Sequence, residues 1–445
     1  MLGMGALVSC EDDTGTAIGT PYNPSQPVKL TSFEPDSGGM ATKLFIDGAN
    51  FGNDPTAVKV YFNKTRANVV GSDGEHLYVI TPRQPGDTCV ISVVVGKDST
   101  IFDKTFRYKT MITVQTIAGV KGDYNYTMGD LTSTRLDQPS TLCLDAEGNI
   151  FVSHWRVPYS FIVINVAKGI SQELFTGEAL GAPSADAEGK VVMAGTDSGD
   201  GYLQFDPESQ WAARRRTILH PTVEEDPTNQ KAFTINYKHG ITSCKIDGYM
   251  YTRSYNGMVV RFDPKTRKGE FVKLNPSGDS GTGRVTDAGY LNPDADSFPY
   301  FDPNHPNIML VAFPGHHCII SVDIETRDAS LYAGTYKTSG YQDGDRLEAK
   351  FNAPCQICSD SNGSIFIGDT NNYCIRKIDS DGKVSTAIGK GTISGYQDGN
   401  AEDALFMGPK GVAIDKDNNI YVADFGTNGS SGHAGSNCIR VLSIQ

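Results

Sequence analysis

The sequence predicts an all-β protein in which a small β-sandwich precedes a ring of six four-stranded β-sheets. Two observations carry this prediction: a hexapeptide that occurs twice, and short runs of β-forming residues that recur along most of the chain. The hexapeptide SGYQDG stands at Ser339–Gly344 and again, 55 residues later, at Ser394–Gly399. A period of this size is typical of radial arrays and solenoids.

The residues after each hexapeptide also share one plan. Each copy is followed by a proline, an apolar run, a Gly/Asn turn, a second apolar run that ends in Asp, and a third run. Pro354 and Pro409 are equivalent in this plan, and Pro139 opens a fainter copy. Three further units are recognised by their second and third runs, in KVVMAGTDSGDGYLQFD, GYMYTRSYNGMVVRFD and NIMLVAFPGHHCIISVD. The chain therefore contains six units.

Each unit offers four short runs rich in Val, Ile, Tyr and Phe, separated by Gly, Asp and Asn, which predicts four antiparallel strands. One such sheet cannot bury both of its faces alone, so six of them around an axis give a six-bladed β-propeller at residues 112–445. The last unit ends one strand short at Gln445, and ITVQTIAG at residues 112–119 has the pattern of the missing strand. We expect this N-terminal strand to close the ring and remove its open edges.

Two families resemble these two parts of the chain. The repeats resemble the NHL-repeat family of β-propellers, most closely in the last two units, where the pattern APxxI…GxIFIGDTNNYCIRKID is clear. Residues 27–109 resemble an IPT/TIG domain, through Pro35, the turn Gly48–Gly52, and the closing Phe106 and Tyr108. About 80 residues with alternating runs and frequent turn signals suit such an immunoglobulin-like sandwich.

The first residues resemble a bacterial lipoprotein signal. Residues 1–10 are apolar and end in Leu7-Val8-Ser9-Cys10, which resembles the lipobox whose Cys10 thiol receives diacylglycerol. A disordered tag or a misplaced start is the alternative, because the positively charged region is missing and the apolar run is short. Acidic residues directly after Cys10 resemble the surface-export signal of glycan-degrading Gram-negative anaerobes, which implies an outer-membrane lipoprotein that faces outside the cell. Residues 11–26, rich in Gly, Thr, Pro and Asn, predict a flexible tether.

Composition narrows the partners. The net charge of −13 and the lack of a Lys/Arg stripe argue against nucleic acid. No later stretch approaches 18 uninterrupted apolar residues, so the lipid is the only expected membrane contact. Cys318, Cys374 and Cys438 fall at the same repeat position, so their side chains point alike, and we expect free, buried thiols.

One set of loops differs from unit to unit, namely the loops that follow the second strand. A repeat that keeps its strands and varies one set of loops presents a binding surface. The aromatic and polar planar residues of this set are His154, Trp155, Arg156, Tyr159, Arg253, Tyr255, His316, His317, Tyr373 and Phe425. Such side chains suit sugar rings or a protein hot spot. The recurrent Asp369 and Asp424 are instead expected to hold their own loops through hydrogen bonds to the backbone.

The sequence offers little for catalysis, since it has neither a G-x-S-x-G nor an H-E-x-x-H motif. We therefore expect no catalytic residues, no cofactor and no metal. The predicted function is a non-catalytic surface lipoprotein that binds carbohydrate as an accessory to glycan uptake, because proteins that resemble this arrangement accompany outer-membrane transporters. A protein-interaction scaffold at the outer membrane is the first alternative, and a propeller lyase or lactonase is the second.

Overall fold

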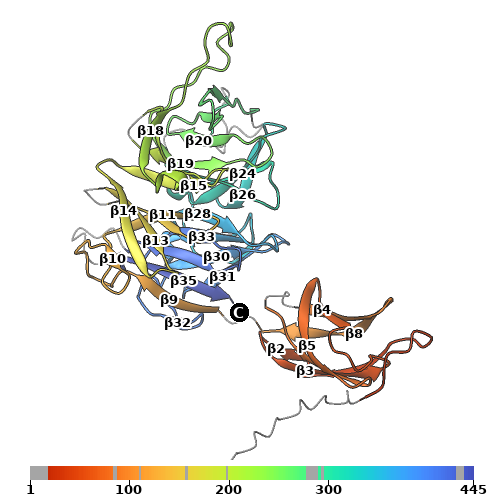
Figure 1. Cartoon of the computed structure of the whole chain (residues 1–445). Coiled ribbons are helices and arrows are strands. Elements are labelled where there is room, and N and C mark those ends of the chain that lie inside the picture. Colours follow the sequence, from red (N-terminus) through yellow and green to blue (C-terminus); the bar gives the residue numbers. More distant parts are fainter. Residues whose placement is uncertain are drawn as a thin grey trace, which may run out of the picture. The chain divides into compact units, whose positions relative to one another are not determined.

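The computed structural model describes residues 19–83, 88–109, 112–155, 159–196, 199–276, 289–291, 295–426 and 435–444. The chain divides into two compact units, and the second begins at Ile112. In these residues both units are built of β-strands, and the second unit also contains three short 3-10 helices (Figure 1). No helix in the described residues is long and apolar enough to cross a membrane.

The first unit is one continuous sheet, folded around an apolar core. Its strand order is β1-β3-β6-β5-β4-β7-β8-β2. These strands are β1 (Lys29–Glu34), β2 (Ser37–Gly38), β3 (Lys43–Ala49), β4 (Val58–Phe62), β5 (Thr65–Ser72), β6 (His76–Ile80), β7 (Thr88–Val95) and β8 (Asp98–Tyr108). Val58, Val60 and Phe62 alternate with more exposed residues along β4, because successive side chains of a strand point to opposite faces. Phe62 meets Phe106 edge to face at 5.3 Å between ring centroids, which joins β4 to β8 in the core.

The second unit holds five sheets among the described residues, in the order of the chain. The first sheet contains β10 (Gly129–Asp130), β11 (Pro139–Leu144), β12 (Ile150–His154), β13 (Ser160–Asn165) and β14 (Ile170–Thr176). The next has eight strands, β15 (Leu180–Ala185), β16 (Val191–Gly195), β17 (Gly201–Phe205), β18 (Ala213–Thr217), β19 (Lys238–Ser243), β20 (Met250–Ser254), β21 (Val259–Phe262) and β22 (Gly269–Phe271), with the 3-10 helix η1 (Pro207–Ser209) after β17.

The remaining three sheets complete the unit. One contains β23 (Phe298–Phe301), β24 (Ile308–Phe313), β25 (Cys318–Asp323) and β26 (Ala329–Gly334), with η2 (Pro314–His316) after β24. The next contains β27 (Gly344–Asp345), β28 (Pro354–Ser359), β29 (Ile365–Asp369), β30 (Cys374–Ile378) and β31 (Lys383–Ile388), with η3 (Thr370–Asn372) after β29. The last contains β32 (Gly399–Asn400), β9 (Ile112–Ala118), β35 (Cys438–Ile444), β34 (Ile420–Asp424) and β33 (Pro409–Ile414), in this spatial order.

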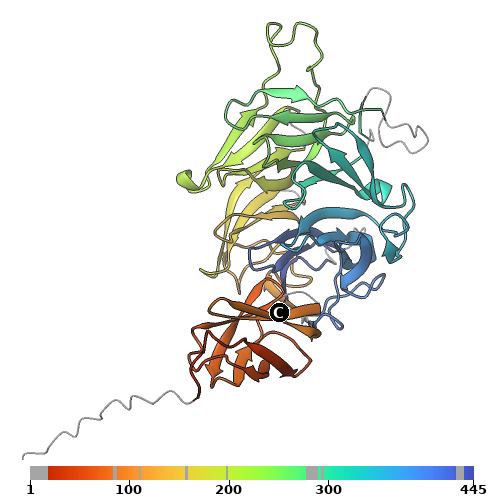
Figure 2. The same cartoon turned by 90° about the vertical axis from the view of Figure 1, so that its right-hand side faces the viewer.

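These sheets are arranged around an axis, like the blades of a propeller. In Figure 2 they follow one another from yellow over green at the top to teal and blue on the right. Their first strands contact in a closed series, β11 with β15, then β19, β23, β28 and β33, and β33 contacts β11 again. We call these strands the inner ring.

Apolar side chains fill the spaces between successive sheets. Phe161 of the first sheet packs on Phe205 of the next at 4.7 Å between ring centroids. Second strands such as β12 and β29 are buried along their whole length. A strand that is covered on both faces is built from consecutive apolar residues instead of alternating apolar and polar ones. This explains why second strands begin with pairs such as Ile150-Phe151 and Ile365-Phe366.

The structure differs from the predicted six sheets of four strands in how the strands are grouped into sheets. β15 and β19 are linked by a parallel bridge between Ala182 and Gly240, which joins two sets of four antiparallel strands into one sheet. Three other sheets gain a fifth strand of two residues, namely β10, β27 or β32. The sequence pattern counts runs and turns, and it does not report such single bridges.

The repeated hexapeptide holds a buried arginine. Arg376 on β30 donates to Gln342 O at 2.9 Å and to Asp343 Oδ1 at 2.5 Å, and its guanidinium lies 5.0 Å from the Tyr341 ring. Asp369, at the end of β29, pairs with the same guanidinium at 3.0 Å. Burial raises the pKa of Asp369 to about 6, so the carboxylate is ionised at neutral pH and balances the buried cation.

The second copy repeats this arrangement. Arg440 on β35 donates to Gln397 O at 2.6 Å and to Asp398 Oδ1 at 2.7 Å, and lies 4.9 Å from the Tyr396 ring. Asp424 accepts hydrogen bonds from the backbone of Met407 and Gly408 and pairs with Arg440 at 3.4 Å. Together with the Asn352 backbone bond to Asp369 (2.7 Å), this confirms that the two recurrent Asp residues hold their own loops.

The cysteines of the described residues are free and buried, all eight of them. Cys318, Cys374 and Cys438 are each the first residue of a third strand, β25, β30 or β35. The prediction of free thiols at one repeat position is confirmed. They pack as small apolar side chains between neighbouring strands.

Candidate ligand-binding site

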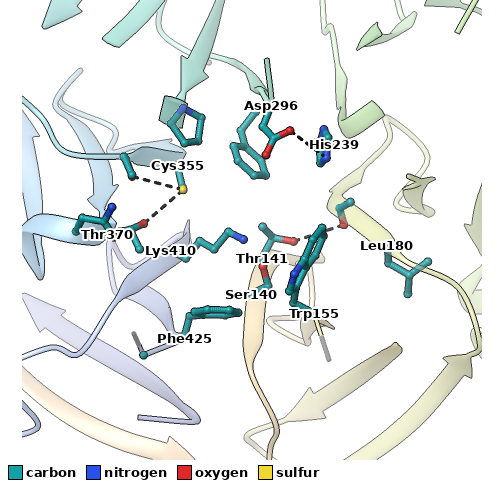
Figure 3. Close-up of a pocket in the computed structure, with 16 residues that line it drawn as sticks. Ser140, Thr141, Trp155, Leu180, His239, Asp296, Cys355, Thr370, Lys410 and Phe425 are labelled. Carbon is teal, nitrogen blue, oxygen red and sulfur yellow. Dashed lines mark hydrogen bonds and ion pairs between the residues drawn. The ribbon is translucent and has the colours of Figure 1, made fainter. Parts of the chain in front are cut away.

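A cavity of about 200 Å³ opens at one end of the inner ring (Figure 3). Every strand of the inner ring contributes a side chain to it. These are Ser140, Leu180, His239, Phe298, Cys355 and Lys410. The ends of second strands contribute Trp155, Pro314, Thr370, Asn371 and Phe425. The cavity therefore lies where the first strands begin and the variable loops meet.

Lys410 lies between two aromatic rings. Its Nζ is 5.1 Å from the ring centroid of Trp155 and 5.1 Å from that of Phe425. Each such cation–π contact stabilises by about 0.5–2 kcal/mol, depending on how dry the site is. Within the described part of the chain, no carboxylate or carbonyl oxygen pairs with this ammonium. Figure 3 shows the Nζ directed toward the centre of the cavity.

A histidine and a carboxylate form the opposite wall. His239 Nε2 lies 3.4 Å from Asp296 Oδ1. The His239 side chain is only 15% exposed, whereas that of Asp296 is 57% exposed. In Figure 3 this pair stands across the cavity from Trp155 and Phe425. The cavity thus offers an anion and hydrogen-bonding oxygens on one side, and a cation with aromatic faces on the other.

Hydroxyl and thiol groups line the remaining wall. Thr141 Oγ1 and Ser153 Oγ share a hydrogen bond of 2.6 Å. Thr370 Oγ1 donates to Pro409 O at 3.1 Å and also lies 3.4 Å from Cys355 Sγ. Burial raises the pKa of the Cys355 thiol, which keeps it protonated and a poor nucleophile. These groups shape this wall of the cavity.

A glutamine bridges the inner ring beneath the cavity. Gln356 Oε1 accepts from Leu142 N at 2.9 Å, and its Nε2 donates to Leu142 O at 3.1 Å. The side chain passes Gly411, where an added Cβ would lie 2.9 Å from Gln356 Oε1. Phe298 lines this cavity and also a second one, of about 250 Å³, that includes Gln356 and Leu142. Gln356 thus links β28 to β11 across the intervening strand β33.

The predicted loop residues divide into three groups. Trp155 and Phe425 line the cavity, and Tyr159 meets Trp155 edge to face at 6.1 Å between ring centroids. Arg156 and Cys10 lie outside the described residues. The other six do not line it.

Two of these six are corrections, because their side chains are buried. His154, the last residue of β12, is 1% exposed and meets Tyr126 edge to face, and burial lowers its pKa to about 3. Arg253 on β20 is 2% exposed and donates to Leu291 O (2.8 Å) and Ala295 O (2.7 Å). The last residues of these second strands are therefore covered by the fold, and neither side chain is available to a ligand.

The other four support the surroundings of the cavity. His317 Nδ1 accepts a hydrogen bond from the backbone N of Ala353, a residue of the cavity wall, at 3.2 Å. His316 stacks on Phe313, and burial lowers its pKa to about 4. Tyr255 meets the ring of Tyr237. Tyr373 ends η3 in the left-handed conformation, with φ of 56°.

The sequence pattern did not predict most residues of the cavity wall, and the ones that carry its charge are Lys410, His239 and Asp296. Lys410 and His239 lie near the start of inner strands, which the repeat pattern treats as core. A signal existed, because the residue after the repeat proline varies from Ser140 to Cys355 to Lys410 while the strand around it is kept. In the described residues, no group of three or more His, Cys, Asp or Glu is placed to hold a metal ion.

Comparisons with known sequences agree with both units. The family described as IPT/TIG domain matches residues 27–108, and the family described as NHL repeat matches residues 406–429. The chain therefore contains an IPT/TIG domain and an NHL repeat in a propeller-like unit. It is 32% identical over 132 residues to NHL repeat-containing protein 2 of Bos taurus, and the match spans 27% of this chain and only 18% of the bovine protein.

Solved structures resemble the whole chain. One is a protein of unknown function from Bacteroides thetaiotaomicron, with a TM-score of 0.74 and 23% identity, covering 96% of this chain and 100% of that one. Another is an auxiliary nutrient binding protein from Bacteroides ovatus, with a TM-score of 0.61 and 20% identity, covering 96% and 100%. At these identities the likeness shows a shared fold.

Proposed function

We propose that this protein is a non-catalytic cell-surface protein that binds an extracellular carbohydrate in the cavity at the end of its inner ring, as an accessory to glycan uptake. The observation that carries the proposal is the wall formed by Trp155, Phe425 and Lys410 opposite Asp296. Sugar rings present apolar C–H faces to aromatic side chains and hydroxyls to polar ones. Protein sites for small molecules combine these two elements in one concave surface.

The proposed carrier of this site is a six-bladed propeller. The inner ring has six strands, and each of the two halves of the eight-stranded sheet has the antiparallel order of one blade. We count these halves as two blades joined by the Ala182–Gly240 bridge.

Closure of the ring by β9 is part of the same proposal. Gly334 ends the fourth strand β26 and Gly389 directly follows the fourth strand β31. An added Cβ at these positions would lie 2.8 Å and 2.9 Å from the carbonyl oxygens of His317 and Tyr373. Gly119 approaches Asn437 O in the same way, at 2.1 Å from an added Cβ. This equivalence supports β9 as the fourth strand of the last blade.

The proposed location is the outer membrane, with a lipid on Cys10 and residues 11–26 as a tether. A solved protein with this fold, from Bacteroides ovatus, is named an auxiliary nutrient binding protein, which supports a role in nutrient capture. An outer-membrane transporter is the proposed partner. Cys10→Ala should leave the membrane fraction for the soluble fraction, and retention in the outer membrane after a salt wash would contradict the anchor.

A screen of soluble polysaccharides by affinity electrophoresis tests the ligand class. A bound polysaccharide should retard the native protein, and Trp155→Ala should weaken the binding by about tenfold, since an aromatic contact contributes roughly 1 kcal/mol or more. Phe45→Ala is the matched control, because Phe45 is an exposed aromatic residue of the first unit, 55% exposed. Both variants should melt close to the native protein, because exposed side chains contribute little to stability.

A protein-interaction scaffold is the second candidate function. The exposed ring of Phe45 stacks on Tyr78 at 5.2 Å between centroids, and Met40 and Val70 are 47% and 49% exposed in the same unit. Exposed apolar groups of this kind suit a protein partner. No retardation by any polysaccharide, together with loss of a specific partner protein in the Phe45→Ala pull-down, would favour the scaffold over carbohydrate binding.

A further inference from the structure

Lys410 differs from two other cations of the second unit, Lys238 and Arg253, in the groups that surround its charge. Buried Lys238 donates to Gly195 O at 3.1 Å, and buried Arg253 donates to Leu291 O at 2.8 Å. Lys410 meets two aromatic rings and no oxygen within the described residues. An ammonium in a partly dry site lowers its free energy by pairing with an anion. This ammonium is therefore suited to pair with an anionic group of a ligand.

We propose that the cavity selects a sugar that carries a carboxylate, a uronic acid, and that Lys410 pairs with this carboxylate. The proposal rests on carbohydrate binding as the proposed function and specifies its ligand class. The Lys410 ammonium is held above Trp155 and Phe425, so a carboxylate that reaches it places the rest of the sugar ring against the same aromatic wall.

The opposite wall limits the charge of the ligand. Asp296 lines the same cavity, and its carboxylate is more than half exposed. A doubly charged phosphate would be attracted by one ammonium and repelled by this carboxylate. Each uronic acid unit carries only one negative charge, whereas a phosphate monoester carries up to two on one group. Its several hydroxyls can donate hydrogen bonds to the Asp296 carboxylate.

The size of the cavity limits the length of chain that enters. Its volume of about 200 Å³ is below the roughly 300–1,000 Å³ of pockets that hold drug-sized ligands. The Gln356 side chain also links β28 to β11 beside the second cavity. A cavity of this volume receives one or two sugar units, and the uronic acid that pairs with Lys410 is one of them.

Isothermal titration of the full chain tests the proposal with three disaccharides. The probes are digalacturonate, the corresponding neutral disaccharide of galactose, and a sulfated galactose disaccharide. The native protein should bind digalacturonate about tenfold more tightly than the neutral disaccharide, because a charge-assisted pair forms only with the acid. Lys410→Met should remove this preference and keep the weaker binding of the neutral disaccharide.

Lys416→Met is the matched control, because it removes the same charge from an exposed turn between β33 and β34. It should keep the preference for the acid. Lys410→Gln is a second neutral variant and should lose the preference for the acid in the same way. Melting temperatures close to that of the native protein show that both Lys410 variants are folded.

Each outcome decides between the two proposals. Equal affinity for the acid and the neutral disaccharide, or an equal loss of both in Lys410→Met, overturns the role of Lys410 and leaves carbohydrate binding standing. Equal or tighter binding of the sulfated probe shows that the cavity recognises charge alone and overturns the uronic acid. Binding of none of the three overturns this proposal, and carbohydrate binding itself then depends on the polysaccharide screen.

Discussion

The buried arginines of the last two sheets and the lysine of the cavity are both cations covered by aromatic rings, but they differ in their anions. Arg376 meets Asp343, Asp369 and the Tyr341 ring, all supplied by its own repeat. Among the described residues, Lys410 meets only the rings of Trp155 and Phe425. A cation with a complete set of partners stabilises the fold, whereas a cation without an anion is suited to a ligand. The comparison separates architecture from binding within one unit.

The largest expected loss of stability comes from removing β9, the strand that contacts the Arg440 network. Thr116 of β9 donates its backbone N–H to Asp398, the carboxylate that also binds Arg440. Deleting residues 1–119 removes this strand and should collapse the cooperative unfolding of the second unit. Deleting residues 1–109 should leave its melting temperature nearly unchanged. Equal melting temperatures of the two truncated proteins in calorimetry would contradict closure by β9.

The next effect comes from the buried arginine itself. Arg376→Ala leaves Asp369 buried without its cation, and removal of one partner from a buried pair costs about 3–5 kcal/mol. Lys383→Ala removes an exposed pair with Asp345 and should cost less than about 1 kcal/mol. Urea unfolding of both variants checks the difference. Similar midpoints would show that the buried network contributes no more than a surface ion pair.

The repeat was predictable from the sequence, but its role was not. The period, the turns and the third-strand cysteines are local patterns, and each depends on residues close in the chain. The contact of Arg376 with Asp343 joins residues 33 positions apart and follows only from the folded sheet. The bridge between Ala182 and Gly240 is likewise a tertiary contact, which the strand count could not include.

The candidate site was also predictable only where it depends on a local pattern of the sequence. Trp155 and Phe425 were predicted because they directly follow the second strand in a variable loop. His154 is the last residue of β12, and Arg253 is the last but one of β20. At such positions the sequence pattern does not separate the last buried residue of a strand from the first exposed residue of the loop. Lys410 faces the axis because the inner strands close into a ring, and no local periodicity reports that direction.

The central claim is that a ligand enters the cavity beside Trp155, and the fluorescence of this residue tests it most directly. The chain has two tryptophans, and Trp211 packs on Phe151 at 4.7 Å between ring centroids, away from the cavity lining. In Trp211→Phe, the emission comes from Trp155 alone. Titration with digalacturonate should shift this emission with saturation at one ligand per chain, whereas unchanged emission at a concentration where calorimetry detects binding would contradict the account.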